Sequence, residues 1–186
     1  MESMIEYVHH RCAKMHVDIS IDFTMGNGFD TLFLSNISNH VYSFDIQNEA
    51  LKQTKKLVGD SQKVTLLLED HLNFDQYITT FDLGIFNLGY LPGGDHQITT
   101  TKDHTLQTLK KALLHVNVNG SIFLVVYIGH LQGKEEGIAL DQFVSTLSSK
   151  EFNVSKYQML NKNNAPYVIE IEKRRSCKNL VIDETL

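Results

Sequence analysis

The sequence contains few cysteines and no cysteine pattern. Among 186 residues there are two, Cys12 and Cys177, which lie far apart and form no Cys-x-x-Cys or Cys/His ligand spacing. We therefore expect no structural zinc site, no iron–sulfur cluster and no disulfide framework. The nine histidines also lack His-x-His or His-x-x-x-His spacing, so no metal site is expected.

Prolines and long apolar runs are equally scarce. The only prolines are Pro92 and Pro166, and no linker, repeat or low-complexity stretch stands out. Residues 1–186 are therefore expected to form a single domain, with an N-terminal helix over 1–15 and a basic tail over 174–186. No run reaches the length of a membrane span and no signal-peptide core opens the chain, which predicts a cytoplasmic protein.

The net charge of −5 provides no overall attraction to nucleic acid. Basic side chains nevertheless gather at two places, Lys102, Lys110 and Lys111 on one segment, and Lys173, Arg174, Arg175 and Lys178 near the C-terminus. Two interpretations stay open for both groups: an RNA contact, or a solvated face and a frayed tail.

Strand-like and helix-like segments alternate along nearly the whole sequence. Strands are predicted over 17–23, 41–46 and 64–70, within 81–91, and over 121–129. Helices are predicted over 2–15, from about residue 30, after the second strand, over 99–116 and near 134–149. Two consecutive strands, 152–160 and 166–174, close the chain. This order indicates an α/β fold, a mostly parallel sheet with a C-terminal antiparallel hairpin, and it resembles the seven-stranded Rossmann-like sheet of class I methyltransferases.

Polar residues gather at the predicted carboxyl ends of the strands, where such sheets bind ligands. After the first strand, Gly26 and Gly28 allow the backbone to turn sharply and approach a ligand. Asp45 ends the second strand and could accept hydrogen bonds from both hydroxyls of a ribose, with Gln47 beside it. This arrangement is typical of S-adenosylmethionine (SAM) or NAD binding, and a structural turn with a chance acid is the alternative.

Glu69, Asp70 and His71 end the third strand, where an adenine amino group would be recognised. A carboxylate or a backbone carbonyl could accept from that amino group. Asp70 could instead cap a helix, and both roles could hold together.

The fourth strand runs into Asn87-Leu-Gly-Tyr90-Leu-Pro-Gly-Gly-Asp95. This stretch resembles the Asn-Pro-Pro-Tyr loop of amino-methyltransferases, with Asn87 and Tyr90 in matching places. An Asn oxygen and a backbone carbonyl can hold the N–H groups of an amine and aim its lone pair at a methyl donor. Asp95 could accept a proton, because the amine must be neutral. A glycine-rich surface turn is the alternative.

Together these patterns define a predicted site in two parts. The cofactor side consists of Asp22, Thr24, Gly26, Asn27, Gly28, Asp30, Thr31, Asp45, Gln47, Asp70, His71 and Asn87. The acceptor side consists of the catalytic candidates Asn87, Tyr90 and Asp95, and of Pro92, Gly93, Gly94, Tyr127 and His130 as substrate contacts.

Five stretches carry a more specific resemblance: DFTMGNGFDTLFL (22–34), VYSFDIQ (41–47), NLGYLPGGD (87–95), VYIGHLQGKEE (126–136) and NKNNAPYVIEIEK (161–173). They resemble a bacterial family once called rRNA methylases and now linked to methylation of 5-aminomethyl-2-thiouridine at the tRNA wobble position. The resemblance implies SAM as cofactor, a 5-methylaminomethyl product, the tRNA anticodon arm as partner and a homodimer. Phe23 departs from the family's Asp-Ala-Thr, and repacking within the sheet could accommodate its ring.

Three other functions remain open. An NAD-dependent oxidoreductase is disfavoured because Thr31 stands where Gly-x-Gly-x-x-Gly has its third glycine. A methyltransferase acting on another RNA, such as rRNA, or on a small-molecule amine would use the same cofactor. A non-catalytic RNA-binding protein of this fold would not need the amine-presenting loop.

Overall fold

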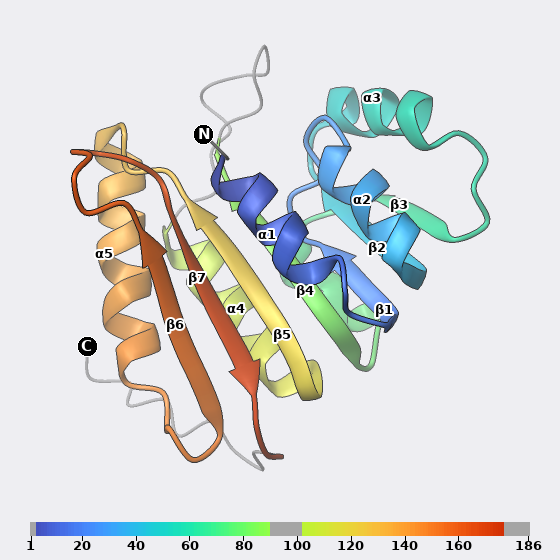
Figure 1. Cartoon of the computed structure of the whole chain (residues 1–186). Helices are drawn as coiled ribbons and strands as arrows, with labels where there is room; N and C mark the ends of the chain where they lie inside the picture. The colour runs from blue at the N-terminus through green and yellow to red at the C-terminus, as the bar shows by residue number, and fades with distance from the viewer. Residues whose placement is uncertain (1–2, 90–101, 177–186) are drawn as a thin grey trace.

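The computed structural model describes residues 3–89 and 102–176, which form one seven-stranded sheet in the order β3-β2-β1-β4-β5-β7-β6 (Figure 1). The strands are β1 (Val17–Asp22), β2 (Ser38–Asp45), β3 (Val64–Leu68), β4 (Phe81–Leu88), β5 (Val116–Val126), β6 (Phe152–Gln158) and β7 (Tyr167–Lys173). Neighbours from β3 to β5 pair in parallel, whereas β7 is antiparallel to both β5 and β6. The predicted fold class and the C-terminal hairpin are confirmed.

Helices cover both faces of the sheet (Figure 1). They are α1 (Met4–Cys12), α2 (Phe29–Ile37), α3 (Asn48–Val58), the 3-10 helix η1 (His71–Gln76), α4 (Lys102–His115) and α5 (Leu131–Ser145). Helices α1 and α2 pack over one face, and η1, α4 and α5 over the other. Each face of the sheet has its own hydrophobic core, and alternating side chains of β5 pack into the two cores. Ile122, Leu124 and Val126 lie in one core, and Phe123 and Val125 lie in the other. None of the described helices is long and apolar enough to cross a membrane.

Several element ends differ from the predicted ones for local reasons. Helix α1 begins at Met4 because Ser3 and Glu6 form a capping box. Helix α5 begins at Leu131, earlier than predicted, because the His130 side chain accepts a hydrogen bond from Gly133 N. Strand β5 begins directly after α4, five residues before the continuous apolar run that predicted it.

Phe23 is accommodated by a neighbouring glycine. Its buried ring stacks on Phe86, with 4.1 Å between centroids, and contacts Phe74 and Phe81 edge-on. A Cβ atom on Gly84 would lie 2.9 Å from this ring. The phenylalanine therefore belongs to the core beneath the first loop, as the repacking interpretation requires.

Helix α1 is tied to the other end of the chain. Arg11 forms an ion pair with Glu170 of β7, at 2.8 Å between Nη2 and Oε1. Tyr7 stacks on Tyr157 of β6, with 4.1 Å between ring centroids. These contacts hold the helix across the antiparallel half of the sheet.

Part of the basic cluster near the C-terminus is structural. Lys173 is 4% exposed, and its Nζ donates hydrogen bonds to the carbonyls of Leu113, Leu114 and Val116 at the end of α4. In the other basic group, Lys111 Nζ donates to Leu72 O and lies 2.8 Å from Asp75 Oδ1. The interpretation of Lys173 as an RNA contact is therefore wrong, because its ammonium group is buried and stabilises the carbonyl end of a helix.

For the other basic residues both interpretations, an RNA contact or a solvated surface, stay open. Lys110 lies over the Phe143 ring at 5.5 Å, and Arg174 lies near Glu172 at 3.6 Å. The side chain of Lys102, and Lys178 altogether, fall outside the part of the chain that the structure describes.

Candidate active site

A cavity of about 1380 Å³ opens at the carboxyl ends of the parallel strands. Its walls come from the loops after β1, β2, β3, β4 and β5, from α1, and from the turn before β7. This is the edge at which doubly wound sheets bind ligands. Loops that are far apart in the sequence therefore meet around one space, as the strand-end pattern predicts.

The glycine loop after β1 has the conformation that the sequence predicts. Gly26 and Gly28 have positive φ angles of 50° and 83°. A Cβ atom on Gly28 would lie 2.6 Å from Thr54 Oγ1 and 2.9 Å from Thr54 Cα, so a side chain at this position would collide with α3. The glycine keeps the loop against α3 and leaves its backbone open toward the cavity.

Asp45, at the end of β2, holds this loop and remains able to bind a ligand. Its Oδ2 accepts from Gly26 N at 3.0 Å, and its Oδ1 accepts from Gln47 N at 2.9 Å. Burial raises the pKa of this carboxyl, and the backbone hydrogen bonds partly oppose that shift. Each carboxylate oxygen has a second lone pair, which suits the two hydroxyls of a ribose.

His71 presents an acceptor atom to the same cavity. The Thr108 hydroxyl donates to His104 O at 3.0 Å, so it accepts the proton of His71 Nδ1 at 2.8 Å. That bond makes Nε2 the lone-pair nitrogen of the ring. Burial lowers the pKa of His71 to about 4, so the ring is neutral near pH 7.

Two buried polar atoms of this cavity wall, His71 Nε2 and Asn27 Oδ1, have no hydrogen-bond partner among the described residues. Buried acceptors of this kind are uncommon, and each calls for a donor. Asp70 lines the same cavity, and its Oδ1 accepts from Leu72 N at 2.8 Å and caps η1. The helix-capping interpretation of Asp70 is confirmed.

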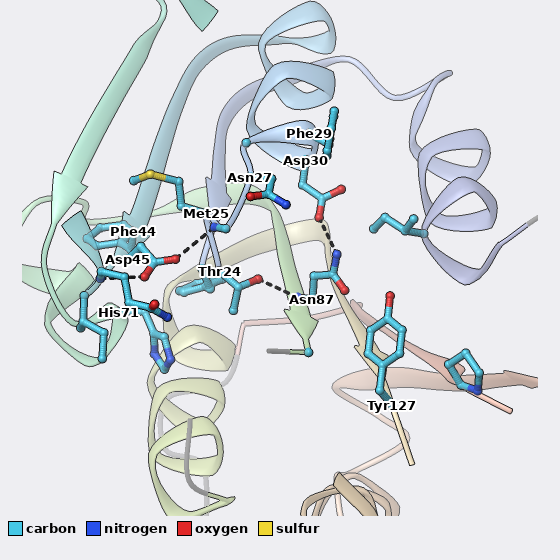
Figure 2. Close-up of a pocket in the computed structure, with 18 of the residues that line it drawn as sticks. Thr24, Met25, Asn27, Phe29, Asp30, Phe44, Asp45, His71, Asn87 and Tyr127 are labelled. Atoms are coloured by element: carbon cyan, nitrogen blue, oxygen red, sulfur yellow. Dashed lines mark hydrogen bonds between the residues drawn. The ribbon is translucent and has the colours of Figure 1, made fainter. Parts of the chain in front are cut away.

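At the other end of the cavity, Asn87 is held from two sides (Figure 2). Its backbone N–H donates to Thr24 Oγ1 at 2.8 Å, and its Nδ2 donates to Asp30 Oδ2 at 3.0 Å. The second oxygen of Asp30 lies 2.7 Å from His9 Nε2. Figure 2 shows the Asp30 and Asn87 side chains pointing toward one another, with Tyr127 beside them.

Tyr127 and His130 both line this end of the cavity. Burial raises the pKa of Tyr127, and the negative charge of Asp30 adds to the effect. His130 also caps α5 through Gly133 N, and a side chain at position 133 would collide with the Tyr127 carbonyl. The Tyr-x-Gly-His-x-x-Gly pattern is thus a tight strand-to-helix turn that presents a tyrosine and a histidine to the cavity.

Two predicted cofactor residues lie beneath the loop rather than in the cavity wall. Asp22 accepts from Thr24 N at 3.1 Å and from the Thr31 hydroxyl at 2.6 Å. Complete burial, followed by the charge of Asp30, raises the pKa of Asp22 to about 7. Asp22 and Thr31 therefore brace the glycine loop. Tyr90, Pro92, Gly93, Gly94 and Asp95 fall outside the described residues.

The structure adds wall residues that the sequence patterns did not single out. They include Ser3, Ile5, Glu6 and His9 of the N-terminal segment, the apolar Met25, Phe29, Phe44, Ile46 and Ile128, His104 of α4, and Asn164 and Pro166 before β7. The periodicity of α1 predicts a buried face but no approach to the strand ends. Asn164 and Pro166 belong to a stretch that the family resemblance included, but no role in the site was predicted for either residue. No group of His, Cys, Asp and Glu side chains in the described residues could hold a metal ion.

This strand order, with a glycine loop after β1 and an acid at the end of β2, defines a class I methyltransferase fold. The profile of a family described as "Putative rRNA methylase" matches residues 41–172. The chain belongs to this family. Membership confirms the predicted methyltransferase class, with S-adenosylmethionine as the cofactor of that class.

Relatives of known name or structure agree with this assignment. A chloroplastic tRNA (mnm(5)s(2)U34)-methyltransferase of Arabidopsis thaliana is 37% identical over 176 residues, which cover 86% of this chain and 64% of that protein. The chain thus spans less than two thirds of the length of that relative. A structure from Clostridium thermocellum described as a "putative rRNA-methylase" has a TM-score of 0.88 at 36% identity, over 93% of this chain and 98% of its own. A structure from Streptococcus mutans described as "a putative methyltransferase", solved in complex with SAH, has a TM-score of 0.85 at 37% identity, over 93% of this chain and 99% of its own.

Proposed function

We propose that the chain methylates the amine of 5-aminomethyl-2-thiouridine at the tRNA wobble position, giving 5-methylaminomethyl-2-thiouridine. The name of the Arabidopsis relative supports this substrate. The observation that carries the proposal is the Asn87 amide, whose Nδ2 is engaged by Asp30 while the side chain lines the cavity. Its Oδ1 is then available to accept an N–H from an amine.

The cofactor fits the wall described above. The Gly26–Gly28 backbone can approach it closely, Asp45 can accept from the ribose hydroxyls, and His71 Nε2 can accept from the adenine amino group. Phe44 and Ile46 supply apolar contacts beside the base. When bound, S-adenosylmethionine would supply its sulfonium methyl group to the amine nitrogen and leave as S-adenosylhomocysteine.

The protein's part in this step is to position the acceptor. Asn87 Oδ1 accepts one N–H of a neutral amine, and the lone pair of that nitrogen is then free to point along the cavity. Holding two reactants in this way can lower a barrier by about 7–11 kcal/mol without a strong base. The methylated nitrogen afterwards loses one proton, for which Asp95 remains a sequence-based candidate.

An RNA acceptor also fits the rim of the cavity. Phe29, the first residue of α2, lines the cavity and is 66% exposed. An exposed aromatic ring beside a nucleotide site can stack on an unpaired base, the usual way in which single-stranded loops are read. The anticodon arm presents such bases. The homodimer implied by the family resemblance belongs to this proposal as well and would enlarge the surface for RNA.

The test is methyl transfer to tRNA that lacks only the terminal wobble methyl group. Purified protein is incubated with this tRNA and methyl-labelled SAM. The tRNA is then digested, and its nucleosides are identified by mass spectrometry. We expect one methyl on 5-aminomethyl-2-thiouridine, no transfer by Asn87→Ala, and SAM binding by both proteins. SAM binding by the wild-type protein without transfer would refute this substrate and favour another RNA, such as rRNA, or a small amine.

A further inference from the structure

We propose that Asp30, itself held by His9, is a positioning residue that fixes which end of the Asn87 amide faces the acceptor amine. The inference rests on the proposed function and deepens it. It assigns a role to helix α1, whose contribution to the site no sequence pattern predicts. It concerns three side chains from three elements, α1, α2 and β4.

The contacts form one chain of hydrogen bonds. Asn87 Nδ2 lies 3.0 Å from Asp30 Oδ2, and His9 Nε2 lies 2.7 Å from Asp30 Oδ1. The Asp30 side chain is 6% exposed, against 22% for His9. The carboxylate sits in the first turn of α2, where the helix dipole favours a negative charge.

A carboxylate can only accept hydrogen bonds, so it selects the donor end of its partner. Against Asp30, the amide of Asn87 must present Nδ2, which turns Oδ1 toward the cavity. In the flipped orientation Nδ2 would face the substrate and donate to the amine lone pair. That lone pair is the nucleophile, so a flipped amide would occupy the electrons that form the N–C bond.

His9 completes the arrangement by fixing the carboxylate. Its ring stacks on Phe33 of α2, with 3.9 Å between centroids and 8° between planes. This stack keeps Nε2 against Asp30 Oδ1, so Oδ2 remains directed at Asn87. Helix α1 thereby contributes to acceptor positioning through a residue that does not need to touch the reacting atoms.

An exchange of the two side chains tests the orientation directly. Asn87→Asp places two carboxylates against each other, and we expect at least a tenfold loss of kcat. In the double variant Asp30→Asn/Asn87→Asp, the donor sits at position 30 and the acceptor at position 87, so one oxygen of the new carboxylate again faces the amine. We expect the exchange to recover about 10- to 100-fold of the lost kcat, with the SAH dissociation constant unchanged.

A matched control uses a surface pair of the same type. Asp18 accepts from Asn39 Nδ2 at 2.7 Å outside the cavity, so Asp18→Asn should leave kcat unchanged. His9→Phe keeps an aromatic ring to stack on Phe33 and removes the donor, and it should lower kcat without changing SAH affinity. A double exchange variant that folds, binds SAH and is no more active than Asn87→Asp alone overturns the proposal.

NMR measurement of amide exchange tests the positioning role of Asp30 without any substrate. The Asn87 side-chain NH₂ signals, assigned by their loss in Asn87→Ala, should exchange slowly with solvent in the wild-type protein and faster in Asp30→Ala. Equal exchange in both proteins would overturn the positioning role. Failure of the wild-type protein to methylate the wobble amine would instead overturn the proposed function and leave the amide measurement intact.

Discussion

Replacing Asp45 by Ala should weaken SAM binding more than it weakens the fold. The carboxylate accepts from Gly26 N and Gln47 N, at 3.0 and 2.9 Å, and keeps one lone pair on each oxygen for a ribose. Hydrogen bonds to a charged acceptor contribute about 1.5–3 kcal/mol. That loss corresponds to a rise in the SAM dissociation constant of about 10- to 150-fold.

The assay is isothermal titration of SAM and SAH into the wild-type and Asp45→Ala proteins at one salt concentration. Asp60→Ala provides the control, because Asp60 is 96% exposed, pairs only with Lys55 in the described residues and lies outside the cavity wall. Its SAM affinity should equal that of the wild type. Thermal denaturation of each apoprotein separates lost binding from lost folding.

Asp45→Asn sharpens the measurement. An amide of the same size keeps one acceptor but turns an NH₂ group toward one of the two backbone N–H donors, so it should bind SAM nearly as poorly as Asp45→Ala. A folded Asp45→Ala protein with a SAM dissociation constant within twofold of the wild type would refute the assignment of the ribose to this strand end.

Two further predictions concern buried groups. Burial lowers the pKa of His71 to about 4, so the folded protein binds fewer protons than the unfolded chain and loses up to about 3 kcal/mol of stability as the pH falls from about 6.5 to about 4. The raised pKa of Asp22 has the opposite effect on stability, so the His71 contribution must be isolated by comparison with a variant. The free energy of urea unfolding is therefore measured at each pH for the wild type and for His71→Gln. Parallel plots of this free energy against pH would refute the prediction. Lys173→Met removes three hydrogen bonds to the end of α4 and should cost about 2–4 kcal/mol in urea unfolding, against less than about 0.5 for the exposed Arg174→Met. Equal losses in these two variants would show that Lys173 is not a structural residue.

The fold was predictable because its patterns are local. The apolar run 121–129 predicts a strand buried on both faces, and β5 lies between β4 and β7, away from both edges of the sheet. Its true start at Val116 was hidden, because Asn117 and Asn119 are poor strand formers and Asn119 adopts a φ of 68°. The sequence therefore predicts which segments form strands better than where they begin.

The site was predictable where it follows the strand ends and unpredictable where distant segments meet. Asp45 and Asn87 come directly from the rule that ligands bind at the carboxyl ends of parallel strands. His9 reaches the same cavity only because α1 packs across β5 and β7, a contact that depends on the complete sheet. The adjacent His9 and His10 are indistinguishable in the sequence, and only the fold separates a site residue from its neighbour.

The attachment of α1 to β6 and β7 has a consequence for biosynthesis. Arg11 and Tyr7 leave the ribosome about 150 residues ahead of their partners Glu170 and Tyr157. Domains generally fold as units, so α1 lacks part of the surface on which it packs until β6 and β7 have been synthesised. The same helix carries His9, whose Nε2 lies 2.7 Å from Asp30 Oδ1 at the cavity. We therefore expect the part of the cavity wall that α1 forms to be completed last, because two contacts that hold this helix come from the final strands.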